Sequence, residues 1–207
     1  KRLIGLGLGA VAIAALAVAG APTRAATPKD GLVMADFIDD IISLDPAEVF
    51  EFSAAEAQAQ IYDRLVTYPA DDVSKLEGLV AESWSVSDDG LHVTFKIRPG
   101  IKFHSGNPLT AKDVEYSLQR VVKLNMSPGF ILTQFGFTPE NMAETIKATD
   151  DSTVVLTLDK PYAPTFLLYC LTAGVGSVVD AKLVKEHETD GDMGHAWLKT
   201  NSAGSGP

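Results

Sequence analysis

The chain has 207 residues, of which 46% are hydrophobic, and its 17 basic and 27 acidic side chains give a formal net charge of −10. This length suits one large domain or two small ones. The acidic balance argues against nucleic acid and anionic membrane surfaces as partners, because phosphate binding requires clustered Lys and Arg. Net charge also opposes self-association, as expected for a soluble protein.

Residues 1–26 have the three parts of a secretory signal peptide. Lys1 and Arg2 precede the uncharged run LIGLGLGAVAIAALAVAGA, and small residues follow in APTRAAT. A basic start, an apolar centre and a small-residue end define such a signal, so we expect cleavage after Ala25 or Ala26. A transmembrane helix is the alternative, since the run approaches the ~20 residues that span a bilayer. Its many Ala and Gly residues favour cleavage.

Cleavage would leave 14 basic and 27 acidic residues, a net charge of −13 over residues 27–207. Cys170 is the single cysteine, so no disulfide can form within the sequence. No cysteine follows the signal, where a lipid anchor would need one, and we therefore expect a freely diffusing periplasmic product. The missing initiator Met and the turn-like ending NSAGSGP indicate a fragment of a longer chain.

The first elements expected are a strand and a helix. The apolar run GLVMADF, residues 31–37, predicts a buried strand. Ser53 and Glu56 have the S-x-x-E spacing of a capping box, in which each side chain pairs with a free backbone N–H at a helix start. A helix is therefore expected over residues 54 to about 65.

The middle of the chain predicts a hairpin followed by a capped helix. Residues 91–97 alternate apolar and polar side chains, and SDDG supplies a tight turn from a strand at 82–87. A short strand at 101–103 follows, and Thr110 caps a helix. The later elements expected are a second hairpin around 142–158, a helix from Pro164, a strand at 174–179 and a short helix capped by Asp180.

The search for chemistry finds no catalytic or metal-binding motif. The four histidines show no H-x-x-x-H spacing and no C-x-x-C pair accompanies them, so neither a metal site nor a cofactor is expected. The glycine-rich stretches lack the context of a dinucleotide loop, a Walker loop or a nucleophile elbow. Adjacent acidic pairs such as Asp88-Asp89 fit turns better than carboxylate catalysis. A binding protein is therefore favoured over an enzyme.

The segment AESWSVSDDGLHVTFKIRPGIKFHSGNPLTAKDVEYSLQR resembles the signature region of the family 5 extracellular solute-binding proteins, the peptide, nickel and oligosaccharide receptors of ABC importers. SLDPA at 43–47, IYDRLV at 61–66 and GSGP at 204–207 are similar to further family segments in the same order. The resemblance implies an α/β, two-lobed periplasmic binding protein, class II-like with an extra subdomain. Residues 27–207 would form only part of its lobe I.

The resemblance also implies where the solute binds. The loop after L-D-P lines the cleft in related receptors, and here it contains Phe50, Phe52 and Ser53. Phe130 and Thr172 fall where relatives approach the ligand. Packing is the alternative for each of these positions: Phe52 could staple the helix that follows, and Phe130 and Thr172 could belong to the core.

Partners follow from the same resemblance. The solute would be captured between two lobes and delivered to an ABC permease in the inner membrane by a monomeric receptor, with peptide favoured and nickel chelates, sugars and opines left open. A secreted hydrolase and a periplasmic chaperone-like binder remain the alternatives. A hydrolase would need a nucleophile, a base and an orienting acid within reach of one another.

Overall fold

The structure is a computed structural model that describes residues 29–31, 33, 35 and 37–207. The chain divides into two units, Lys1–Asp36 and Phe37–Pro207, and all the helices and strands described belong to the second. The predicted signal peptide, residues 1–26, lies outside the described residues. At the described positions of residues 31–37 there is no strand pairing, and Val33 is exposed, so the buried strand predicted there is wrong.

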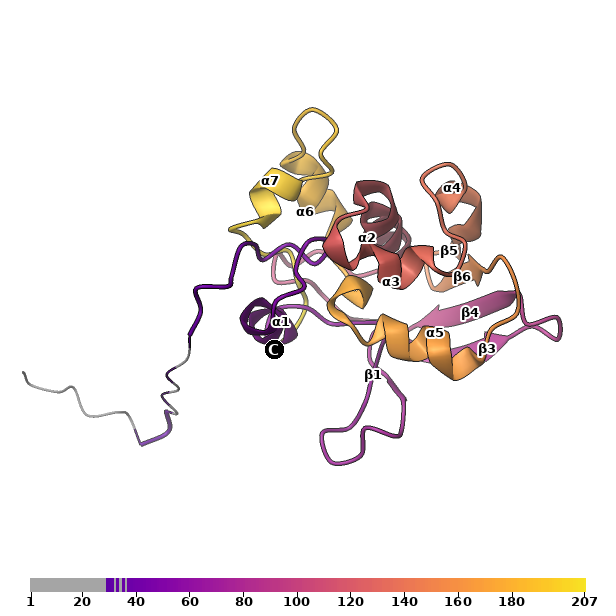
Figure 1. Ribbon diagram of the computed structural model, residues 1–207, viewed down its shortest axis with the longest axis horizontal. Helices are drawn as coiled ribbons and strands as arrows, with labels where there is room; N and C mark the ends of the chain where they lie inside the picture. Colours follow the sequence, from indigo (N-terminus) through magenta and orange to yellow (C-terminus); the bar gives the residue numbers. More distant parts are fainter. Residues whose placement is uncertain (1–28, 32, 34, 36) are drawn as a thin grey trace, which may run out of the picture. The chain divides into compact units, whose positions relative to one another are not determined.

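The second unit contains a four-stranded antiparallel sheet, which lies on the right in Figure 1. Its strands, in the spatial order β3-β4-β6-β5, are β3 (Ala81–Val86), β4 (His92–Ile97), β6 (Thr153–Thr157) and β5 (Ile146–Asp150). Both predicted hairpins are confirmed, because β3 pairs with β4 and β5 pairs with β6. The second hairpin begins only at β5, since the preceding residues form the short helix α4 (Met142–Thr145).

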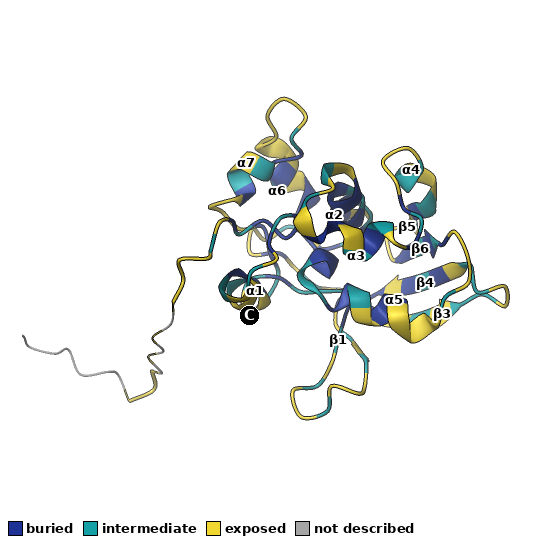
Figure 2. Cartoon of the chain, in the orientation of Figure 1, coloured by how far each residue is buried: buried dark blue, intermediate teal, exposed yellow. Residues whose placement is uncertain are grey.

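One face of this sheet is buried against helices. Along β4, Val93, Phe95 and Ile97 are buried while His92 and Lys96 are exposed, which is the alternation that the sequence predicts (Figure 2). The buried face shares one hydrophobic core with α2 (Ala111–Leu124) and α5 (Pro164–Leu171). The apolar residues that the α2 sequence brings to one side are therefore its packing face.

Local side-chain chemistry fixes the ends of these elements. The Asp89 carboxylate accepts hydrogen bonds from the Leu91 N–H and the Ser87 hydroxyl, and Gly90 adopts a φ of +70°, which closes the first hairpin turn. The Thr110 N–H and hydroxyl both donate to Asp113 Oδ2 at 2.8 Å, so the predicted cap of α2 is confirmed. The strand predicted at 101–103 is reduced to a bridge between Lys102 and Pro108.

The helix expected over 54–65 is shorter and begins earlier. Helix α1 spans Phe52–Ala59 with Glu51 at its N-cap, and the capping box predicted for Ser53 is wrong, because the Ser53 hydroxyl donates to the Phe37 carbonyl. The helix ends because the following residues make non-local pairings. Ile61 accepts from the Gly206 N–H, and β1 (Val66–Thr67) pairs with β2 (Glu77–Gly78).

The segment 174–179 also differs from the predicted strand. It begins as a 3-10 turn, η2 (Gly174–Gly176), and then Ser177 bridges to Arg64. The predicted short helix is confirmed as α6 (Ala181–Glu186), whose N-cap Asp180 accepts from the Leu183 N–H. The remaining short elements are η1 (Ser127–Gly129), α3 (Phe130–Thr133) and α7 (His195–Leu198).

Among the residues that the structure describes, none of the helices combines the length and the apolar character needed to cross a membrane.

Candidate functional site

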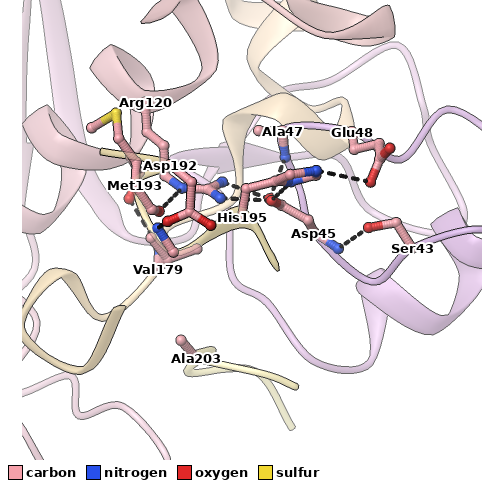
Figure 3. Close-up of polar contacts among 12 residues, drawn as sticks. Ser43, Asp45, Ala47, Glu48, Arg120, Val179, Asp192, Met193, His195 and Ala203 are labelled. Carbon is pink, nitrogen blue, oxygen red and sulfur yellow. Dashed lines mark hydrogen bonds and ion pairs between the residues drawn. The ribbon is translucent and has the colours of Figure 1, made fainter. Parts of the chain in front are cut away.

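A buried ion pair anchors the L-D-P loop. Asp45 is fully buried, and both of its carboxylate oxygens accept hydrogen bonds from the Arg120 guanidinium, at 2.5 and 2.6 Å (Figure 3). Arg120 lies on α2, is itself buried, and also donates its Nε–H to the Met193 carbonyl at 2.7 Å. A bidentate, desolvated pair of this kind imposes one geometry on the two segments that it joins.

His195 extends this cluster to α7. Its Nδ1 lies 2.8 Å from Asp45 Oδ2, and because an ionised carboxylate only accepts hydrogen bonds, Nδ1 carries the hydrogen. On the other side of the ring, Nε2 lies 3.7 Å from Glu48 Oε2, within ion-pair range, and Lys199 lies 3.6 Å from Glu48 Oε1. The loop around residues 43–48 is thus fixed to two other segments of the chain (Figure 3).

The anchored loop leads directly into the wall of a surface hollow. The hollow has a volume of about 560 Å³, in the range of small-molecule sites. Its walls come from the loop and α1, from residues on both sides of β1, from η1 and α3, and from the segment after α5 that leads into η2. The lining residues are Val49, Phe50, Glu51, Phe52, Ala55, Glu56, Gln58, Ala59, Arg64, Tyr68, Pro128, Ile131, Thr172, Ala173, Gly174 and Val175.

Exposed aromatic side chains stand at one side of this hollow. Phe50 and Phe52 line it and are 57% and 90% exposed. Phe130 does not line it, but its ring packs edge-on against Phe50 with centroids 5.8 Å apart, and it is 54% exposed. Phe52 is the first residue of α1 rather than a residue before its cap, so the hydrophobic staple considered for it is absent.

The other two predicted site residues have structural partners. Thr172 lines the hollow but is buried, and its hydroxyl donates to the Tyr169 carbonyl at 2.8 Å. Ser53 is not among the lining residues, and its hydroxyl is engaged by the Phe37 carbonyl. The structure therefore gathers Phe50, Phe52 and Thr172 around one hollow, places Phe130 beside it, and leaves Ser53 outside.

Two polar lining residues were missed by the sequence reasoning: Gln58 is buried and Arg64 is partly buried. The Gln58 side chain is fully buried, and the Arg64 guanidinium donates through Nη1 to the Thr172 carbonyl at 2.6 Å. Burial lowers the pKa of Arg64, and the nearby Tyr68 opposes this shift. Their sequence context, a helix and the IYDRLV segment, gave no sign that both would face the same hollow as Phe50.

Within residues 37–207 and the few described before them, no group of three or more His, Cys, Asp or Glu side chains is arranged to hold a metal ion. Cys170 is a free, partly buried thiol, and burial raises its pKa.

Comparison with known proteins places this fold among the periplasmic binding proteins. A solved structure of the periplasmic binding protein DppA from Helicobacter pylori, in complex with the peptide STSA, superposes with a TM-score of 0.63 at 30% sequence identity. The match covers 80% of this chain and 33% of that protein. The chain is thus an α/β part of a two-lobed binding-protein fold, as the sequence predicts.

Residues 75–207 match the family described as bacterial extracellular solute-binding proteins, family 5 Middle, and the chain belongs to this family. The probable D,D-dipeptide-binding periplasmic protein DdpA of Escherichia coli (strain K12) is 36% identical over 187 residues, which are 89% of this chain and 34% of that protein. Heme-binding protein A of Haemophilus influenzae is 34% identical over 142 residues, 61% of this chain and 25% of the relative. The chain therefore spans about a third or less of these curated relatives.

Proposed function

We propose that the protein containing this chain is the substrate-binding component of an ABC importer, which captures a small solute between two lobes and delivers it to a membrane permease. The observation that carries this proposal is the hollow of about 560 Å³ beside the L-D-P loop, with the exposed rings of Phe50 and Phe52 in its wall. Family membership supports it. The function is binding without turnover.

Peptide is the solute class that we favour. The relatives reported above bind, by their names, a D,D-dipeptide, heme and the peptide STSA, two of which are peptides. An apolar aromatic wall with a few polar groups suits a peptide, because stacking surfaces accept varied side chains while polar groups fix orientation. The hollow has both kinds of group, since Gln58, Arg64 and Thr172 line it together with Phe50 and Phe52.

The cellular setting belongs to the same proposal. We infer that residues 1–26 are a cleaved signal peptide, that the mature protein is a periplasmic monomer, and that residues 27–207 form part of its first lobe. Closure of two lobes would bury the solute and distinguish the loaded from the empty receptor.

A thermal-shift screen of the mature natural protein against peptides, metal chelates and oligosaccharides tests the proposal. A true ligand at a hundredfold excess over its dissociation constant should raise the free energy of unfolding by about 2.7 kcal/mol. Absence of a shift across all three solute classes would contradict a receptor function. Hydrolysis of a solute at a rate that depends on a residue of the hollow would instead indicate an enzyme.

Phe52→Ala then tests the site itself. Because the Phe52 ring is 90% exposed, its removal should change stability little, whereas a ligand that stacks on it would bind about tenfold more weakly. Ile42→Ala is the matched control, since Ile42 is also exposed, at 61%, and does not line the hollow. Equal ligand affinity in both variants would remove Phe52 from the proposed site.

A further inference from the structure

The L-D-P loop contains a buried acceptor atom that has no donor. Glu48 Oε2 is closed to solvent and lacks a hydrogen-bond partner among the described residues. Because water does not reach this oxygen, only the protein can supply a donor, and a buried carboxylate oxygen without one is costly. Nε2 of His195 lies 3.7 Å from it, within ion-pair range. The protonation state of this ring nitrogen therefore decides whether the oxygen gains a partner.

The opposite side of the His195 ring already has a defined role. Nδ1 donates its hydrogen to Asp45 Oδ2 at 2.8 Å. In the neutral ring, Nε2 then carries a lone pair and no hydrogen, so it would present an acceptor to the acceptor of Glu48. In the protonated ring, Nε2 carries a second hydrogen, and the ring can bridge Asp45 and Glu48 (Figure 3). The geometry therefore fits the protonated ring better than the neutral one.

The charges around His195 favour the same state. They come from the L-D-P loop, from α2, and from the residues before and after α7. The charged groups are Asp45, Glu48, Asp192, Arg120 and Lys199. Three carboxylates against two cations leave one negative charge, which a protonated ring would balance. Burial raises the pKa values of Tyr62 and Tyr116 beside the Asp45–Arg120 pair, so both tyrosines stay neutral.

The loop that His195 contacts continues directly into the hollow. Residues 49–52 line the hollow and follow Glu48 in the chain. The N–H groups of Glu48 and Val49 both donate to the Asp45 carbonyl at 3.0 Å, so the two carboxylates that face His195 belong to one tight turn. A change in the contact between His195 and Glu48 therefore acts on the first residues of the hollow's wall.

We propose that His195 is a positioning residue whose protonation fixes the L-D-P loop, so that loss of the proton weakens both the fold around this loop and the binding of solute in the hollow. A proton that the folded loop retains adds stability at low pH, and this contribution is lost as the pH rises through the range in which histidine loses its charge. By reciprocity, a solute that requires the fixed loop binds more tightly at low pH. The link to solute rests on the proposed function, whereas the effect on the loop does not.

Urea unfolding of the mature natural protein at about pH 5.5 and about pH 8, where histidine is the side chain that ordinarily changes charge, tests the effect on the loop without solute. The measured quantity is the ratio of the folding equilibrium constants at the two pH values. His195→Asn keeps an N–H for Asp45 but cannot take a proton, so this ratio should fall by about five- to tenfold. Because each variant is compared with itself, a general loss of stability does not affect the ratio.

Two further variants make the unfolding test specific. Glu48→Gln removes the charge that faces Nε2 and should also lower the ratio, because a neutral amide no longer attracts the protonated ring. His92→Asn is the matched control, since His92 is exposed and its ring nitrogen pairs with the neutral hydroxyl of Thr157. Its ratio should equal that of the unmodified protein.

Calorimetric titration with trialanine at the same two pH values tests the link to solute binding. The ratio of the dissociation constants at about pH 8 and about pH 5.5 should be about fivefold larger in the unmodified protein than in His195→Asn. The amino group of trialanine also titrates toward the higher pH. This contribution is the same for both proteins and cancels in the comparison.

An unfolding ratio that His195→Asn leaves unchanged would overturn the proposal. A ratio that falls only in Glu48→Gln would do so as well, because Glu48 would then be the titrating group. A lowered unfolding ratio with equal trialanine ratios in the two proteins would overturn the link to solute binding and support the loop contact alone. A lowered unfolding ratio without trialanine binding at either pH would support the loop contact and count against peptide in the proposed function.

Discussion

The buried Asp45–Arg120 pair gives the most specific prediction for stability. Both side chains are almost completely inaccessible, and two hydrogen bonds of 2.5 and 2.6 Å join them. Arg120→Met keeps most of the side-chain volume but leaves the Asp45 carboxylate buried with only His195 and the loop backbone beside it. Removing one partner of a buried pair typically costs about 3–5 kcal/mol, and we expect a loss of this size.

Urea unfolding of the mature protein, followed by far-UV circular dichroism, measures this loss. Asp45→Asn should be similarly damaging, because it leaves Arg120 as the unpaired charge. The double variant should be more stable than the sum of the two losses predicts, by about 2 kcal/mol, since the second substitution removes the charge that the first left unpaired. Arg98→Met, at an exposed arginine, should change stability by no more than about 0.5 kcal/mol.

An Arg120→Met loss below about 1 kcal/mol would refute this reasoning, as would strict additivity in the double variant. Either result would mean that the L-D-P loop is fixed by packing and not by the ion pair. If the reasoning is correct, the same variant should also weaken solute binding, because residues 49–52 of the hollow follow directly from the loop that Asp45 anchors.

Three further predictions concern the scaffold. Thr110→Ala should lower stability by about 1 kcal/mol in urea unfolding, because the cap of α2 is lost; no change would show that the cap contributes nothing. Gly204→Ala should cost about 3 kcal/mol, since its Cβ would overlap the Ile61 carbonyl oxygen, and a fully stable variant would contradict the observed pairing of that segment. Hydrogen bonds from the Ser152 hydroxyl and N–H lower the pKa of Asp150 to about 2. The contribution of the ionised Asp150 to the free energy of unfolding is therefore complete above the usual pKa of about 3.9 and is lost as the pH falls toward 2. Asp150→Asn should flatten the acid unfolding profile in this window, and an unchanged profile would contradict the prediction.

The elements that the sequence predicts well are those that local chemistry determines. The hairpin turn at Asp89, the cap at Thr110 and the cap at Asp180 each depend on side chains that bind backbone groups a few residues away; at the cap of α2 this is the Asp113 carboxylate, which accepts from the Thr110 N–H. Such interactions can be recognised without knowledge of the rest of the fold. Each of these three elements is present where it was expected.

The errors lie where distant segments compete with local preference. Residues 61–66 have helical spacing but leave α1, because Ile61 binds Gly206 and Arg64 bridges to Ser177. The apolar run 174–179 has strand-like composition, but its first residues turn as η2 beside Gln58. Tertiary pairing of this kind overrides propensity and is invisible in a single segment.

The candidate site likewise contains residues that the sequence could point to and residues that only the folded structure reveals. Family resemblance pointed to Phe50 and Phe52, and the structure places both on the hollow, although solute contact by these residues stays a prediction. Arg64 and Gln58 could not be selected from the sequence, because what distinguishes them is buried polar atoms, Arg64 Nε and both polar atoms of the Gln58 amide, that have no hydrogen-bond partner among the described residues. An unpaired buried group is a property of three-dimensional packing and has no sequence pattern.

A crystal structure of the mature natural protein with a peptide from the thermal-shift screen tests the central claim most directly. The account predicts that the peptide occupies the hollow beside the L-D-P loop, in contact with the rings of Phe50 and Phe52. A peptide bound elsewhere, with this hollow free of ligand, would contradict the assignment of the solute site to this part of the chain.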